Sequence, residues 1–180
     1  TVTVDDYYIG QYEVTQELYK FVMGYNPSHF VGDSLPVDNI SWVDAKTFIY
    51  ELNKMTGKNY RLPTEAEWEF AARGGRWSKG LNYSGSDNIN DVCWCDGNSG
   101  RKTHKVGTKA PNELGIYDMS GGLFEYMASY RDNNLGNSGF ETNPTSIYNE
   151  KYFDIYPNDG SITNYNHRIL GDATGELGPF

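Results

Sequence analysis

The chain has 180 residues, a length that suits one domain, and it combines 20 Gly with 15 Tyr. Its formal net charge of -9 argues against nucleic acid as a partner, because phosphate groups repel an acidic surface. No stretch of 18 apolar residues occurs, so no membrane-spanning helix is expected. Abundant Tyr, Trp and Gly with few long apolar runs predict a loop-rich α+β domain.

The start of the chain predicts a strand or hairpin followed by a helix. The β-forming residues of the first segment are Tyr7, Tyr8, Ile9, Tyr12 and Val14, and Gly10 breaks the run. Thr15 is a candidate N-cap and Gly24 supplies the helix stop. Between them, helical spacing relates the apolar residues Leu18, Phe21 and Val22.

Two further helices are predicted before residue 75. Ser41 is the N-cap of the first, with Asp44 three residues on, and Gly57 ends it. Thr64 and Glu67 form the capping box of the second. The apolar positions expected to face inward are Trp42, Ala45, Phe48, Ile49 and Leu52 in the first helix, and Trp68, Ala71 and Ala72 in the second. Trp42 and Trp68 are therefore predicted to be core residues, and Arg61 is predicted to be a structural ion-pair partner.

After Gly75 the sequence predicts mostly loops. Gly, Asn, Asp and Ser dominate residues 77–113, with one short strand expected at 91–95. No internal repeat or interdomain linker is visible, so residues 1–180 are expected to form one domain.

Several motifs then occur in order along the chain. They are Tyr12-Glu13-Val14-Thr15, residues 36–45 (PVDNISWVDA), residues 60–69 (YRLPTEAEWE), residues 111–121 (PNELGIYDMSG) and Glu125. Over residues 7–130 this series resembles the formylglycine-generating enzyme, or sulfatase-modifying factor, family. The resemblance implies an irregular C-type-lectin-like α+β fold with two or three short helices and small antiparallel sheets.

The resemblance also implies a calcium site. In the family, a carboxylate or amide side chain, two backbone carbonyls and a Glu hold the ion. These ligands fall on Asp118, Gly121, Leu123 and Glu125, and Asn88 and Ile89 are candidates for a second, weaker calcium site. The residues suit that chemistry, because carboxylates are hard oxygen donors and glycines permit the tight turn between them. Without the resemblance, the same residues describe a glycine turn with two solvated acids.

The cysteines bear on whether the chain is an enzyme. Family enzymes oxidise a substrate cysteine to formylglycine with a late cysteine pair that binds copper(I), and thiolates suit this soft metal. Here Cys93 and Cys95 lie upstream of the calcium loop, and no cysteine follows them. We therefore assign neither a catalytic role and expect two buried thiols. The arginine- and glycine-rich core segment that closes the family's domain is not recognised after residues 168–176.

Two functional hypotheses remain open from the sequence. The first is a calcium-stabilised, non-catalytic domain that binds a protein or glycan, as do retroelement-diversified variable proteins of this fold. The second is a sulfatase-maturing oxidase, or a fragment of one, which alone would require copper. A secreted or cell-surface location is favoured by the calcium and the fold. His29, His104 and His167 are expected in loops or on the surface, without metal-binding partners.

Overall fold

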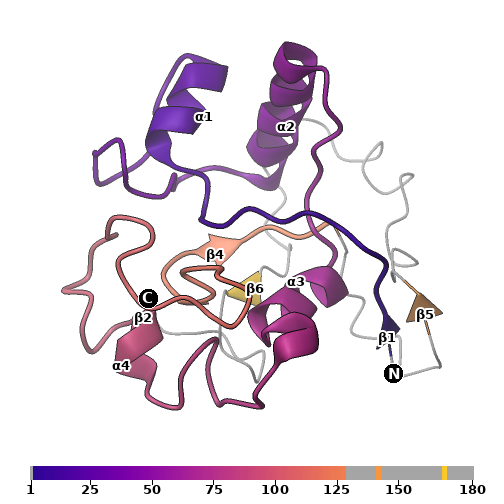
Figure 1. Cartoon of the computed structure of the whole chain (residues 1–180). Helices are drawn as coiled ribbons and strands as arrows, with labels where there is room; N and C mark the ends of the chain where they lie inside the picture. Colours follow the sequence, from indigo (N-terminus) through magenta and orange to yellow (C-terminus); the bar gives the residue numbers. More distant parts are fainter. Residues whose placement is uncertain (1, 129–140, 143–167, 170–180) are drawn as a thin grey trace, which may run out of the picture.

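Three capped helices carry most of the regular structure in the computed structural model, which describes residues 2–128, 141–142 and 168–169. They are α1 (Gln16–Met23), α2 (Trp42–Thr56) and α3 (Glu65–Ala72). The predicted N-caps are confirmed, and the caps of α2 and α3 are both complete capping boxes. In Figure 1, α1 and α2 lie together on one side of the molecule and α3 lies on the other.

The buried face of α1 is formed by a polar residue and an aromatic one. Leu18 and Phe21 are 39% and 72% exposed, whereas Gln16 and Tyr19 are buried. The ring of Tyr19 stacks on Phe48 of α2 at a centroid distance of 5.3 Å. The Gln16 amide donates to the carbonyls of the loop that follows α1. The predicted helix is therefore confirmed, and it contacts α2 through an aromatic ring and its neighbouring loop through a buried amide.

Two short segments also depart from the prediction. Residues 7–14 are irregular rather than a hairpin, and the first strand is β1 (Val2–Thr3). The strand expected at 91–95 is shorter, because Asn88 caps a one-turn helix α4 (Ile89–Val92) and β2 covers only Cys93–Trp94. A 3-10 turn at Gly75–Trp77 follows α3.

The strands form three short pairs among the described residues. β4 (Phe124–Glu125) pairs antiparallel with β6 (Arg168–Ile169), as expected for this fold. The pairs β2–β3, with β3 at Ser120–Gly121, and β1–β5, with β5 at Glu141–Thr142, are parallel instead. The small sheets expected for this fold are therefore present, but one of the three described pairs is antiparallel and two are parallel.

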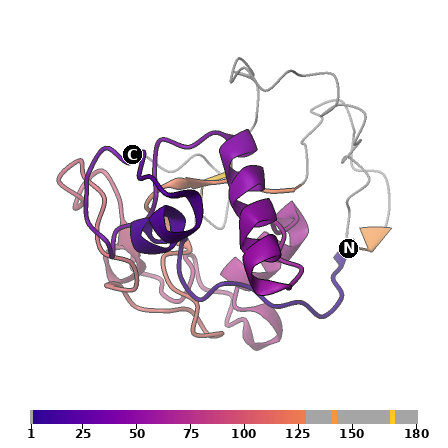
Figure 2. The same ribbon diagram turned by 90° about the horizontal axis from the view of Figure 1, so that it is seen from above.

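The core confirms the assignment of both tryptophans. Trp68 is 3% exposed and packs with residues of α3 and the later loops, namely Ala71, Ala72, Ile116, Met119 and Met127. Trp42 is 9% exposed, and its indole nitrogen donates to the Met127 carbonyl at 3.2 Å. Figure 2 shows α2 and α3 from above, and the chain of β4 passes beneath α2 in this view. Both helices therefore contact the segment that carries the predicted calcium loop, through Trp42 and Trp68.

Arg61 is the ion-pair partner that the sequence predicted. Its guanidinium forms two hydrogen bonds with the Glu67 carboxylate, at 2.6 and 2.7 Å. The same carboxylate completes the capping box of α3 by accepting from the Thr64 amide. Among the described residues, no helix is long and apolar enough to cross a membrane.

Candidate functional site

The predicted calcium loop is a tight turn between β3 and β4. Asp118, Gly121 and Gly122 all have positive φ angles, of 59, 72 and 78°. A side chain at Gly121 would lie 2.3 Å from the Cys93 sulfur and 2.9 Å from the Trp94 carbonyl. The turn therefore requires glycine for both its conformation and its close approach to β2.

The structure brings a third carboxylate to this turn. Glu13 lies against it, because a side chain built at Gly122 would lie 3.4 Å from Glu13 Oε1. Burial first, and then the charges of Glu125 and Asp118, raise the pKa of Glu13 well above its ordinary value. Burial likewise raises the pKa of Glu125 to about 8, with a contribution from the charge of Asp118. The charged forms of these acids are therefore poorly stabilised by the protein alone.

The hydrogen bonds of the three acids leave acceptor capacity free. Asp118 accepts from the Gly107 amide at 2.6 Å, and Glu125 accepts from the Trp68 indole at 3.1 Å. Burial raises the pKa of Asp118, and the bond from Gly107 opposes that rise. Oε1 of Glu13 is buried without a hydrogen-bond partner. Buried hard oxygens in this state fit a divalent cation such as calcium.

A metal centre built from side chains alone is absent from the described residues. They contain no group of three or more His, Cys, Asp or Glu side chains placed to hold a metal ion. The predicted set uses two side chains, Asp118 and Glu125, and two backbone carbonyls, Gly121 and Leu123. The calcium site therefore stays a prediction. The donor types of these residues are those that calcium prefers.

The second candidate site has a local structural explanation. The Asn88 side chain caps α4 by accepting from the Asn90 amide, and it donates to Asp91 at 3.0 Å. Ile89 is the first residue of that helix. The Asn88 side chain is thus already used by the helix cap, and calcium there stays a prediction.

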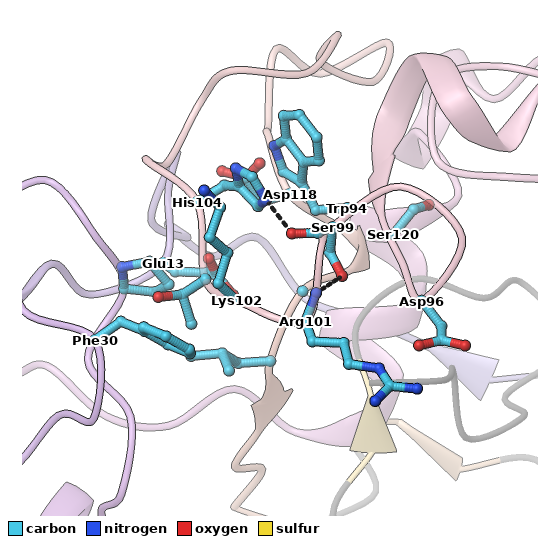
Figure 3. Close-up of a pocket in the computed structure, with 14 residues that line it drawn as sticks. Glu13, Phe30, Trp94, Asp96, Ser99, Arg101, Lys102, His104, Asp118 and Ser120 are labelled. Atoms are coloured by element: carbon cyan, nitrogen blue, oxygen red, sulfur yellow. Dashed lines mark hydrogen bonds between the residues drawn. The ribbon is translucent and has the colours of Figure 1, made fainter.

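A cavity of about 460 Å³ opens beside the turn (Figure 3). Glu13 and Phe30 lie on one side of it, and Trp94, His104 and Ser99 lie on the other. The His104 ring stacks on Trp94 at 3.8 Å, and its Nε2 contacts the Ser99 carbonyl at 2.7 Å. These contacts fix the wall formed by residues 94–104, so the cavity has defined sides.

A second cavity of about 650 Å³ adjoins the first. The two cavities share five of their lining residues, which are Glu13, Phe30, Pro36, Thr103 and Leu123. The second continues along the apolar face of α2 to Trp68 and β4. Volumes of this size suit a small ligand or a side chain of a larger one.

The cysteines are both free and buried, as the sequence predicted. Burial, followed by the neighbouring Cys95, raises the pKa of the Cys93 thiol far above its ordinary value. A protonated, buried thiol is a poor nucleophile and a poor metal ligand. His29 and His104 lie in loops as predicted, whereas His167 lies outside the described residues.

Sequence reasoning missed the place of Glu13 beside the glycine turn. Glu13 was recognised only as part of a motif, although an acid between Tyr12 and Val14 is an unusual residue for an apolar stretch. Its proximity to residues 118–125 arises from tertiary packing over more than one hundred residues. Only the charge at an otherwise β-forming position offered a signal.

The chain is similar in sequence to several known proteins. A family model described as the Sulfatase-modifying factor enzyme 1-like domain matches residues 1–153. The Chaperone protein LppX of Paenibacillus barcinonensis is 38% identical, with 69% of this chain and 62% of that protein aligned. A Formylglycine-generating enzyme of Thermomonospora curvata is 35% identical, with 53% of this chain and 33% of the enzyme aligned. The chain thus spans less than two thirds of the length of either curated relative.

A solved structure extends the likeness to three dimensions. The Treponema denticola variable protein 1 matches with a TM-score of 0.75 and 29% identity, covering 93% of this chain and 73% of that protein. The match confirms the irregular α+β fold class predicted from the sequence.

Proposed function

Since the chain belongs to the sulfatase-modifying factor enzyme 1-like domain family, we propose that it is a calcium-stabilised, non-catalytic domain that binds a protein or glycan ligand. The observation that carries this proposal is the state of the two cysteines. Copper(I) chemistry of the family's kind requires two accessible thiolates that face a substrate. Cys93 is 1% exposed and Cys95 is 9% exposed, and the Cys93 sulfur lies against Gly121 of the glycine turn.

A binding role is supported by the cavities beside that turn. Their walls combine aromatic rings with a few polar groups, a composition typical of ligand sites. Two of the relatives are described as a chaperone and as a variable protein, descriptions that fit binding rather than chemistry.

Calcium is proposed to stabilise the loops around this site. Asp118, Glu125 and the carbonyls of Gly121 and Leu123 would hold the ion. Bound calcium would stabilise the charged forms of the buried carboxylates, including the nearby Glu13, which burial otherwise disfavours. Extracellular calcium-binding modules have dissociation constants of about 10⁻⁴–10⁻³ M, so a secreted or cell-surface location suits such a site.

A second candidate function is formylglycine generation itself, in which copper would be the cofactor. The specific observation in its favour is the 35% identity to an enzyme with that description. That alignment covers one third of the enzyme, so its activity does not transfer on identity alone.

One experiment separates the two functions. The purified chain is incubated with copper(I), oxygen and a sulfatase-motif peptide, and the peptide mass is followed for conversion of cysteine to the aldehyde. We expect no conversion, because both thiols are buried. Conversion that disappears in Cys93→Ser or Cys95→Ser would overturn the proposal and place the active site at this cysteine pair.

A further inference from the structure

One segment of the chain concentrates positive charge beside the smaller cavity. Residues 97–112 contain no Asp or Glu, although the whole chain has 24 acidic and 15 basic residues. The basic residues of this segment are Arg101, Lys102, Lys105 and Lys109. Arg101 and Lys102 line the cavity, and Figure 3 shows both at its wall. A basic wall on an otherwise acidic protein favours an anionic ligand there.

Three of these cations have no carboxylate partner in the part of the chain that the structure describes. Arg101, Lys102 and Lys105 are exposed, and none of them forms an ion pair there. Asp96 lines the same cavity but is not ion-paired with either Arg101 or Lys102. Lys109 differs, because its ammonium group donates to a backbone carbonyl at 2.5 Å. The first three are therefore available to a ligand.

The backbone of this basic wall is already held in place. The Val106 amide donates to the Ser34 carbonyl at 3.1 Å, and the Gly107 amide donates to the Asp118 carboxylate at 2.6 Å. A ligand that binds an ordered wall does not bear the entropy cost of ordering it.

The turn that leads into the wall places an arginine in an unfavourable conformation. Gly100 and Arg101 both have positive φ angles, of 62 and 58°. A residue with a side chain typically loses about 1–2 kcal/mol in this left-handed region, so a second glycine would suit the turn better. Residues held in such conformations cluster at ligand sites, and the Arg101 side chain lies at the cavity (Figure 3).

Two of the acids that line this cavity belong to the calcium turn. Asp118 accepts from Gly107 and is a proposed calcium ligand, and Glu13 lies against Gly122. A bound divalent cation is the largest local charge at such a site and would balance these two carboxylates. With calcium in the turn, the charge that a ligand meets at the wall is therefore positive.

We propose that the basic wall binds an acidic peptide segment, with carboxylates on Arg101 and Lys102 and a neighbouring apolar side chain in the cavity. A guanidinium group can hold a carboxylate through two parallel hydrogen bonds, and an ammonium group adds a compact charge. The cavity offers apolar surface from Phe30, Pro36 and Leu123. The inference rests on the binding function proposed above and names the class of ligand.

A peptide fits this wall better than an acidic glycan does. A sugar ring is held best against the open face of an aromatic side chain, and Trp94 is the aromatic residue beside these cations. Its ring stacks on His104 at 3.8 Å, and the Lys109 ammonium lies 4.1 Å from its centre. The ring is therefore already covered, whereas the adjoining apolar space suits a peptide side chain.

The test is calorimetric titration of the full chain, in calcium-containing buffer, with the peptide acetyl-Glu-Glu-Leu-Glu-Gly-amide. One control peptide replaces every Glu with Gln, and another replaces Leu with Gly. We expect the acidic peptide to bind and each control to bind about tenfold more weakly or worse, because each lacks one of the two recognised groups. Sodium chloride at about 1 M should also weaken binding, because it shortens the Debye length to about 3 Å.

Two variants assign the binding to this wall. Arg101→Gly removes the guanidinium group and suits the positive φ, so it should melt at or above the temperature of the wild type. Lys102→Gln removes the second charge. Each should weaken binding of the acidic peptide by about threefold to tenfold. Lys58→Gln is the matched control, because it removes an exposed charge that lines neither cavity, and it should keep full affinity.

Several results would overturn this inference. These are absence of binding, equal binding of the Gln peptide, or full affinity in a variant that combines Arg101→Gly with Lys102→Gln. Equal affinity of the peptide without Leu would refute the use of the cavity. Tighter binding of an oligogalacturonate of the same charge would assign the wall to acidic glycans instead. The proposed function fails separately, through aldehyde formation in the assay above, whatever these titrations show.

Discussion

Trp68 links the hydrophobic core to the buried acids. Its ring packs with α3 and the later loops, and its indole nitrogen donates to Glu125. Trp68→Ala should lower the free energy of unfolding by about 3–5 kcal/mol, because it empties a large core position. Trp68→Phe keeps most of the packing and should cost less. Urea unfolding of both variants measures the difference, and a Trp68→Ala protein of near wild-type stability would refute this account of the core.

The Arg61–Glu67 pair predicts a specific dependence of stability on pH. The hydrogen bond from Arg61 is the largest of the effects that lower the pKa of Glu67, followed by burial in the opposite direction and the bond from Thr64. A lowered pKa in the folded state stabilises the protein above the unfolded-state pKa, which is about 4.3, and that contribution is lost as pH falls through the folded pKa.

The measurement compares unfolding free energies of the wild type and Glu67→Gln between pH 7 and pH 2. At pH 7 the variant should lose about 1.5–3 kcal/mol, near the lower end because the Arg61 side chain is 55% exposed. The difference should shrink toward acid. A constant difference across this range would mean that the Glu67 carboxylate is not the titrating group.

At the scale of single elements, the helix caps are the features that sequence predicted best. Thr15, Ser41 and Thr64 all cap helices where expected, because a cap depends on residues within one turn of each other. The buried face of α1 was not predictable in the same way. It depends on a partner helix and a loop that local spacing does not contain.

The α3 cap gives an element-scale prediction. Thr64→Ala should destabilise the protein by about 1–2 kcal/mol, because the Glu67 amide loses its acceptor at a buried position. Thr64→Ser retains the hydroxyl and should lose less. Thr47→Ala is the matched control, since Thr47 lies exposed within α2. Thermal unfolding of the three variants tests this order, and equal losses at both positions would contradict it.

At the scale of the whole molecule, the site combines segments that are distant in sequence. Motif order along the chain indicated the fold and two of the three buried acids, since Asp118 and Glu125 lie in one loop. It did not indicate that Glu13 joins them. That relation follows from the packing of Glu13 against the glycine turn, more than one hundred residues away in sequence.

Calcium should therefore act on the stability of the whole domain. An ion that binds only the folded state stabilises it by about 2.7 kcal/mol at a hundredfold excess over its dissociation constant. Adding a chelator should lower the melting temperature of the wild type, because the folded state then loses the free energy of ion binding. Glu125→Gln removes one proposed ligand and should melt at the same temperature with and without chelator. Glu51→Gln, at a partly exposed position of α2, should keep the full response to chelator. A wild-type melting temperature that is unchanged by chelator would show that these acids are accommodated without calcium.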